Sequence, residues 1–293
     1  MRSELSIGIA GAGRMAQALG RLLVERGEPV AAVASRGESA ARAAEFIGGG
    51  VEAVSYKELP RRAGRILIAV ADSAVPAVAE TLAEAMAEAG LSGGVALHTC
   101  GTLGPEALEP LADRGVSCGT IHPLQTVAAP GQGVAALPGS AFAVAGDTEA
   151  LAWAERIAAI LDGEPLRIAP KFRPVYHAAA VMASNYVVTL LDAAVILMGA
   201  AGITEDRALR AIAPLAKASL NNAADLGPLR ALTGPIERGD SETVALHLNA
   251  LEKEPESVRE LYRSAGLHAL DLARRRGLNE AAAKRVETVL RKR

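Results

Sequence analysis

Small residues near the start of the chain have the spacing of a phosphate-binding turn. Residues 11–16 read GAGRMA, so Gly11, Gly13 and Ala16 follow the pattern G-x-G-x-x-A. The turn comes directly after an apolar run, residues 5–10, and directly before a helical pattern. A strand, a glycine turn and a helix start, in this order, form the context in which the pyrophosphate of a dinucleotide binds.

Each position of this turn has its own physical reason. Gly11 permits the tight turn, Gly13 lets a pyrophosphate approach the backbone, and Ala16 lets the helix pack close to the strand. The start of the helix adds free N–H groups and a partial positive charge. The sequence therefore predicts a dinucleotide site contacted by the turn residues Gly11, Ala12, Gly13, Arg14, Met15 and Ala16.

The end of the expected second strand indicates which dinucleotide binds. The stretch reads VASR, and its first carboxylate is Glu38. A carboxylate would repel a 2′-phosphate, whereas Ser35 can hydrogen-bond it and Arg36 can pair with it. We therefore expect NADP(H). The alternative is that Arg36 is an ordinary solvated residue at the start of a turn. Further cofactor contacts are expected from residues that follow later strands, namely Ala71, Asp72 and His98.

Two histidines follow neighbouring expected strands, at the edge where ligands of open α/β sheets bind. His98 ends one strand, and His122 ends the next, directly before Pro123. Proline holds the preceding residue in extended backbone, which fixes the direction of the ring. His122 is therefore a candidate proton donor to a substrate oxygen. The alternatives are a buried, hydrogen-bonded imidazole for His98 and helix capping for Asp72.

A second polar group opens the later half of the chain. Lys171 precedes a long apolar helix, expected from residue 174 to about 199, which carries His177, Ser184 and Asn185. Residues seven apart share a helix face, so His177 and Ser184 would stack roughly 10 Å apart. These residues are candidates for catalysis. The alternatives are surface charge for the lysine, hydrogen bonding of the serine to its own helix, and an asparagine that bridges two helices.

A third polar group lies between two expected helices, where residues 232–240 read LTGPIERGD. Arg238, Thr233 and the backbone at Gly234 would suit a substrate carboxylate. Asp240 is alternatively the N-cap of the following helix.

The elements that position these residues alternate in the first half and are helical in the second. Strands are expected at residues 6–10, 30–34, 66–70, 95–98, 117–121, 141–145 and 165–168. Helices are expected between them at 15–25, 39–47, 75–89, 103–112 and 149–161, and later at 205–222, 241–251, 255–275 and 279–291. This order predicts a mostly parallel, doubly wound α/β Rossmann domain, residues 1–169, followed by an all-α domain, residues 170–293.

Composition narrows the function classes. The formal charge is −2 and no basic stripe occurs, so nucleic acid is not an expected partner. Two cysteines without ligand spacing predict neither a disulfide framework nor a metal site, and favour the cytoplasm. Residues 178–201 are apolar enough to span a membrane, but Asp192 and three uncharged polar residues interrupt them. We therefore expect a buried core helix and no membrane partner.

Several motifs together resemble a known architecture. They are residues 11–16, 98–101 (HTCG), 122–126 (HPLQT), 176–186 (YHAAAVMASNY) and 233–240. The chain is similar to the superfamily of pyrroline-5-carboxylate reductases, β-hydroxyacid dehydrogenases and ketopantoate reductases. It resembles more closely a bacterial family with a Rossmann-like domain followed by a domain of unknown function.

The resemblance implies an NADP(H)-dependent reductase of a small carboxylate such as ketopantoate. It also implies a helical domain of the 6-phosphogluconate-dehydrogenase C-terminal type and a homodimer formed by that domain. β-Hydroxyacid dehydrogenases carry a catalytic lysine one turn before the asparagine, and Val181 occupies that position here. The proton donor thus stays open among His122, Lys171 and His177. Alternatives are an imine reductase, an NADP:deazaflavin oxidoreductase and a non-catalytic NADPH sensor.

Overall fold

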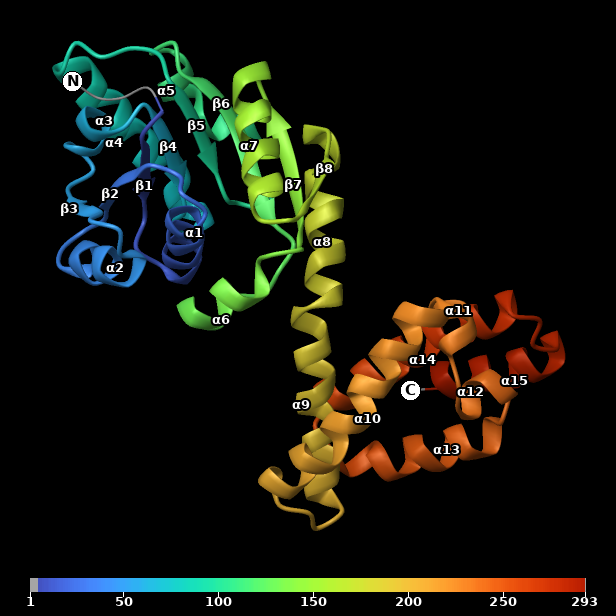
Figure 1. Ribbon diagram of the computed structural model, residues 1–293. Coiled ribbons are helices and arrows are strands. Elements are labelled where there is room, and N and C mark those ends of the chain that lie inside the picture. The colour runs from blue at the N-terminus through green and yellow to red at the C-terminus, as the bar shows by residue number, and fades with distance from the viewer. Residues whose placement is uncertain (1–4, 293) are drawn as a thin grey trace. The chain divides into compact units, whose positions relative to one another are not determined.

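The computed structural model describes residues 5–292 and divides into two compact units, Met1–Ser184 and Asn185–Arg293 (Figure 1). The expected boundary at residues 169/170 lies before this division, because the helix after Lys171 packs with the first unit. The first unit is an α/β structure, and the second is helical, so the predicted fold class is confirmed.

The first unit is built on one eight-stranded sheet with the order β3-β2-β1-β4-β5-β6-β7-β8. Neighbouring strands are parallel except β6 and β7, which are antiparallel. The first six strands therefore have the 3-2-1-4-5-6 order of a dinucleotide-binding domain. The strands are β1 (Ile7–Ala10), β2 (Val30–Ala34), β3 (Glu52–Val54), β4 (Arg65–Ile68), β5 (Val95–His98), β6 (Ser117–Pro123), β7 (Ala141–Gly146) and β8 (Glu164–Arg167).

Helices cover both faces of this sheet, and two apolar cores result. Ile7 and Ile9 of β1 pack with α1, α2 and α7 on one face, and Ile66 and Ile68 of β4 pack with α3, α4 and α5 on the other. The central strands read as continuous apolar runs because both faces are buried. The helices are α1 (Arg14–Glu25), α2 (Ser39–Ile47), α3 (Leu59–Arg62), α4 (Val75–Glu88), α5 (Glu109–Ala112), α6 (Pro130–Ala136), α7 (Thr148–Ile160) and α8 (Arg173–Ala183).

Four features of this unit differ from the expected elements. The edge strand β3 and the helices α3 and α6 were not predicted, because the strand has three residues and both helices are short. The helix expected at residues 103–112 is a 3₁₀ turn, Pro105–Leu108, followed by the short α5. Pro110 has no N–H to donate to the carbonyl four residues earlier, so a continuous α-helix cannot form there.

The long apolar helix is neither continuous nor buried. Ser184, with φ −120° and ψ −74°, separates α8 from α9 (Asn185–Ala200). Arg173 is the one buried residue of α8, and no described residue of α9 is buried. The expectation of a buried core helix is therefore wrong for the single chain. The stretch Pro170–Ala200 has the length and hydropathy of a membrane span, and 6% of its most apolar window is buried.

The second unit is a helical bundle with its own core. Val244, Leu248, Val286 and Leu290 are buried together where α13, α14 and α15 meet. Its helices after α9 are α10 (Glu205–Leu226), α11 (Pro228–Ala231), α12 (Pro235–Arg238), α13 (Ser241–Ala250), α14 (Glu256–Arg275) and α15 (Glu280–Arg291). The four longer ones match the expected helices, whereas α11 and α12 are single turns that the sequence pattern did not predict.

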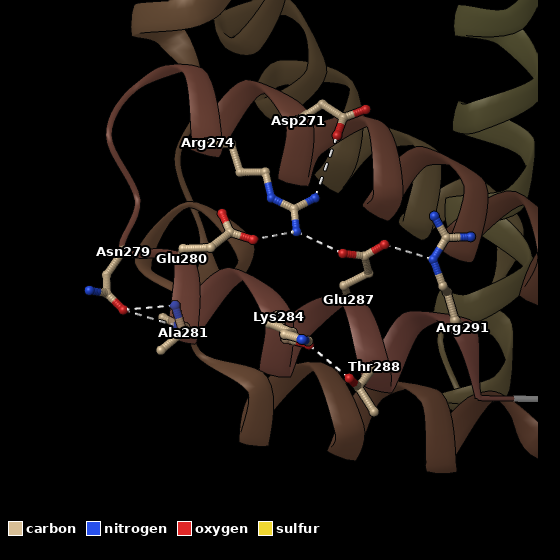
Figure 2. A network of polar contacts seen from close by, with 10 residues as sticks. Asp271, Arg274, Asn279, Glu280, Ala281, Lys284, Glu287, Thr288 and Arg291 are labelled. Atoms are coloured by element: carbon tan, nitrogen blue, oxygen red, sulfur yellow. Dashed lines mark hydrogen bonds and ion pairs between the residues drawn. The ribbon is translucent and has the colours of Figure 1, made fainter.

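An ion-pair network joins the last two helices, as Figure 2 shows. Arg274 of α14 contacts Glu287 at 2.7 Å and Glu280 at 3.2 Å, both on α15. Arg291 pairs with the other oxygen of Glu287 at 2.9 Å. Asn279 caps α15 by accepting hydrogen bonds from two backbone N–H groups. These contacts fix the register of α15 on α14, although partly exposed pairs contribute little stability each.

Candidate functional site

A cavity of about 770 Å³ lies at the carboxyl ends of β1, β2 and β4, where the dinucleotide site was expected. Such a position, at the reversal of strand order, is where open α/β sheets bind ligands. The cavity is lined by Gly11, Ala12, Gly13, Arg14, Met15, Ser35, Arg36, Ser39, Tyr56, Ala69, Val70, Ala71, Thr99 and Val127.

The turn between β1 and α1 has the geometry that a phosphate needs. Gly11 has φ +130°, and a Cβ there would overlap the carbonyl of Ala69. Nothing lies within 4 Å of a Cβ built on Gly13, so the backbone is open to a ligand. Gly13 is the N-cap of α1 and provides no side-chain hydrogen bond, and the first turn holds no acidic residue. The N–H groups of the first turn can therefore bind an anion.

Ser35 and Arg36 lie at one end of this cavity with two residues that sequence reasoning missed. The hydroxyls of Ser35 and Ser39 are 2.8 Å apart, and the Ser39 hydroxyl donates to the carbonyl of Arg36. The Arg36 charge lies near the Tyr56 phenol, whose pKa is raised by burial. Two hydroxyls, a guanidinium and an aromatic ring suit a phosphorylated ribose and a base.

Three of the expected cofactor residues do not line the cavity. Ala16 is fully buried and packs α1 on the sheet, which is the role expected for it. His98 is also fully buried, with Nδ1 accepting from the N–H of Cys100 and Nε2 beside the carbonyl of Gly104 at 2.9 Å. Both ring nitrogens of His98 are therefore used in shaping the loop after β5, and the buried-imidazole alternative holds. Asp72 is exposed and does not cap α4.

A second polar cluster is centred on a buried arginine at the start of α8. Arg173 is fully buried and donates to the Thr120 hydroxyl at 2.8 Å and to the carbonyl of Cys100 at 2.7 Å. Its Nε is buried without a hydrogen-bond partner among the described residues. These two bonds tie α8 to β6 and to the loop after β5. Because Thr99 of the same loop lines the cavity, cavity and cluster are adjacent along the chain.

His122 lies beside two aromatic side chains from α8. Its Nδ1 is 2.9 Å from the hydroxyl of Tyr176, and its ring centroid is 5.8 Å from that of His177. A Cβ on Gly101 would overlap His177 and would lie 2.9 Å from the His122 Nε2, so only glycine fits between them. The structure thus brings the predicted His122 and His177 together and adds Tyr176, which sequence reasoning missed.

Burial and neighbouring charges hold His122 in its neutral form. Burial is the largest cause that lowers the pKa of His122, and the charges of His177, Arg173 and His98 act in the same direction while Asp72 opposes them. The net result is a pKa of about 4. Burial also raises the pKa of the Tyr176 phenol, while the Arg173 charge lowers it. At neutral pH the cluster therefore holds a neutral His122 imidazole and a protonated Tyr176 phenol.

The other predicted catalytic residues are less well placed. Lys171 is exposed, with its ammonium 4.8 Å from the ring centroid of Phe172. Ser184 interrupts the helix that His177 belongs to, so the expected stacking of the two on one continuous helix is wrong. Asn185 begins the second unit, and its carbonyl accepts from Thr189. Lys171, Ser184 and Asn185 stay predictions.

In the second unit, the predicted carboxylate-binding loop is partly explained by helix capping. Asp240 caps α13 by accepting from the N–H of Thr243 at 3.0 Å. The side chain of Arg238 is exposed and forms no ion pair or hydrogen bond among the residues described, whereas its backbone N–H donates to the carbonyl of Gly234. Thr233 lines an apolar cavity of about 420 Å³ in this unit, together with the hydrogen-bonded pair of His247 and Tyr262.

No cluster of three or more metal-ligating side chains occurs within residues 5–292.

Comparison with known families identifies two domains. Residues 1–123 match the family described as Rossmann-like domain, and residues 140–269 match the domain of unknown function DUF2520. None of the curated proteins matches the chain.

Solved structures share the fold at low sequence identity. A Bacteroides fragilis protein provisionally named an NADP oxidoreductase is 24% identical, with a TM-score of 0.73 over 90% of this chain and 97% of its own. Protein TM1727 of Thermotoga maritima is 23% identical, with a TM-score of 0.70 over 92% and 99%. The NADP-bound pyrroline carboxylate reductase of Plasmodium falciparum is 14% identical, with a TM-score of 0.59 over 99% of both chains.

Proposed function

We propose that this chain, a Rossmann-like domain followed by a DUF2520 domain, is an NADP(H)-dependent reductase of a small carbonyl acid. The observation that carries the proposal is the cavity at the start of α1, with Ser35 and Arg36 at one end. Solved structures of the same fold include an NADP-bound reductase, which supports the cofactor.

The residues of this cavity fit NADP(H). The pyrophosphate would contact the backbone from Gly11 to Met15, because Gly13 is open and the first N–H groups of α1 are uncapped. The 2′-phosphate would contact Ser35, Ser39 and Arg36. When bound, the nicotinamide supplies a hydride.

The substrate proposed first is a 2-keto acid of the ketopantoate type. His122 at the end of β6 and His177 of the neighbouring helix α8 supply polar groups, and Lys171, Ser184 and Asn185 are kept as further candidates. In the second unit Arg238, with Thr233 and Gly234, is proposed to hold the carboxylate, because its guanidinium is exposed and unpaired among the described residues.

The cofactor is tested by binding and the reaction by turnover. We expect NADPH to bind more tightly than NADH, and Arg36→Ala to weaken NADPH at least tenfold while NADH changes little. Arg42→Ala, on the exposed side of α2, is the control. Equal binding of both cofactors, or no effect of Arg36→Ala, would contradict the assignment.

Turnover is followed as loss of NADPH absorbance with ketopantoate, other 2-keto acids and 1-pyrroline-5-carboxylate supplied in turn. Arg238→Ala should raise KM with little change in NADPH binding. Tight NADPH binding without turnover of any of these substrates would refute the reductase and favour a sensor.

An imine substrate is the second candidate. Reduction of a carbonyl requires a proton at oxygen, whereas an iminium arrives already protonated. The low pKa of His122 leaves no imidazolium at neutral pH, which favours the substrate that needs less acid assistance. Turnover of 1-pyrroline-5-carboxylate without turnover of 2-keto acids would establish this alternative.

We propose a homodimer, which the exposed apolar surface of the second unit supports, and a cytoplasmic location, which the two free cysteines fit. Val188 and Leu190 of α9 and Leu215 and Leu220 of α10 are between 47% and 69% exposed. A patch of this kind on a soluble chain marks an interface, and a second copy offers the same apolar surface. Light scattering after size exclusion should give twice the chain mass, and Leu215→Glu should give the monomer. A wild-type monomer in the absence of detergent would refute the dimer.

A further inference from the structure

We propose that the hydroxyl of Tyr176 is the proton donor for carbonyl reduction, and that His122 is the residue that positions it. The inference rests on the proposed reductase function and extends it by one catalytic residue. The observation that carries it is the 2.9 Å contact between the Tyr176 hydroxyl and the His122 Nδ1, at the carboxyl end of β6.

The pair lies where the substrate of this fold is expected. Thr99 lines the nucleotide cavity, and the carbonyl of the next residue, Cys100, binds Arg173 three residues before Tyr176. The loop after β5 therefore joins the cavity to the cluster through consecutive residues. Tyr176 is half-buried, so its hydroxyl is held by the protein and still accessible.

The hydrogen-bond inventory leaves one hydrogen of the pair free. A neutral imidazole carries one N–H, and a phenol carries one O–H. If His122 carries its hydrogen on Nδ1, it donates to the phenol oxygen, and the phenol hydrogen is free for a ligand. His122 Nε2 forms no hydrogen bond among the described residues, and Gly101 is the residue packed against it. The ring orientation is fixed by Pro123 after it and by α8 beside it.

The Tyr176 phenol supplies the one proton that carbonyl reduction needs in addition to the hydride. When a hydride adds to the carbonyl carbon, the π electron pair moves to the oxygen, and that oxygen takes the proton from Tyr176. A phenol is a stronger acid than the alcohol formed, so the transfer is downhill. The phenolate left behind is reprotonated by water, and the nearby Arg173 charge stabilises it meanwhile.

Two of the other candidate donors, His122 and Lys171, fit less well. His122 is neutral because its pKa is about 4, so it has no imidazolium proton to give at neutral pH. Lys171 is exposed and precedes α8, with its ammonium against the ring of Phe172. Tyr176 remains protonated through the physiological range because its pKa is raised.

The test compares Tyr176→Phe with the matched control Tyr186→Phe, which removes the hydroxyl of an exposed tyrosine on α9. We expect Tyr176→Phe to lower kcat for a 2-keto acid about 100-fold or more while KM and NADPH binding change little. Reduction of a preformed cyclic iminium should stay within about threefold, because that substrate carries its proton already. The wild-type kcat should be flat through the pKa of an ordinary histidine.

Two results would overturn the proposal. An unchanged kcat of Tyr176→Phe on the keto acid would exclude the phenol as donor. Equal losses on the keto acid and the iminium would make Tyr176 a structural residue. If neither substrate turns over with bound NADPH, the reductase function itself fails, and this inference fails with it.

A readout without turnover tests the pair directly. Nitrogen NMR of labelled histidine should show His122 neutral above about pH 5, with its hydrogen on Nδ1. Tyr176→Phe should shift the Nδ1 signal, and Tyr186→Phe should not. A His122 that titrates as an ordinary histidine, or that carries its hydrogen on Nε2, would remove the basis of the proposal.

Discussion

Protonation of His122 should destabilise the first unit in acid. The folded chain holds the pKa of His122 at about 4, whereas the unfolded chain has an ordinary value of about 6.5. Between these values the unfolded state binds the proton and the folded state does not. The free energy of unfolding therefore falls as pH drops from about 6.5 to about 4, and is flat above that range.

The size of this effect follows from the two pKa values. At full protonation the difference corresponds to about 3 kcal/mol, and near pH 5 about 2 kcal/mol is already lost. His122→Gln cannot titrate, so its unfolding free energy should lose about 2 kcal/mol less than that of the wild type between neutral pH and pH 5. His122→Gln also changes the hydrogen bond to Tyr176, but this change affects the variant at both pH values. It therefore cancels when the unfolding free energies of one protein at the two pH values are subtracted.

The assay uses the single tryptophan of the chain. Trp153 lies in α7 and is buried in the core of the first unit, so its fluorescence in a urea titration reports the unfolding of that unit. His268→Gln, at an exposed position of α14, is the control and should keep the wild-type pH dependence. The same pH dependence in His122→Gln and the wild type would refute the argument that burial keeps His122 neutral.

Three further substitutions test the turn and the buried arginine. Gly11→Ala should destabilise the first unit by about 2 kcal/mol or more and abolish NADPH binding, because the residue has φ +130° and a Cβ would overlap the carbonyl of Ala69. Gly13→Ala should leave the urea midpoint unchanged, because a Cβ there contacts nothing in the protein. It should weaken NADPH binding at least tenfold, because the Cβ would occupy the space that the pyrophosphate needs. Arg173→Met should cost about 3 kcal/mol by Trp153 fluorescence, because two buried acceptors lose their donor. Wild-type urea midpoints for Gly11→Ala or Arg173→Met, or wild-type NADPH affinity for Gly13→Ala, would contradict these assignments.

The cavity at the start of α1 was predictable because its determinants are local. A strand, a turn and a helix start within residues 5–25 fix the position of Gly11 and Gly13, whatever the rest of the chain does. Tyr56 was missed because it follows the three-residue edge strand β3, which is too short for an alternating pattern to be recognised. A tyrosine two residues after an expected third strand would have been the only signal.

The second cluster was only half predictable because its bonds join distant parts of the chain. Arg173 reaches Thr120 and Cys100, and Tyr176 reaches His122, over more than fifty residues of sequence in each case. The ends of neighbouring strands must lie side by side, so His98 and His122 could be placed together. The loop after β5 buries His98, and α8 lies beside His122. The positions of this loop and this helix cannot be derived from the spacing of residues in the sequence.

The exposure of α8 and α9 could not be derived from their composition. An apolar helix is buried by the core of its own chain, by a second chain or by lipid, and the residue pattern does not separate these cases. Asp192 makes burial of this stretch in lipid costly, but it does not distinguish the other two cases. The apolar residues of α9 and α10 therefore point to an interface only when the structure shows that they are exposed.

The buried guanidinium of Arg173 is difficult to explain by packing alone. It forms no ion pair within residues 5–292, it bonds two neutral oxygens, and its Nε has no partner there. An apolar side chain of similar length would avoid the cost of burying a charge, although it would leave the Thr120 hydroxyl and the Cys100 carbonyl without their donor. What only the arginine provides is a permanent positive charge beside His122 and Tyr176, which lowers the pKa of both. That charge opposes an imidazolium on His122 and favours the phenolate that remains after Tyr176 gives up its proton, so it supports Tyr176 as the proton donor.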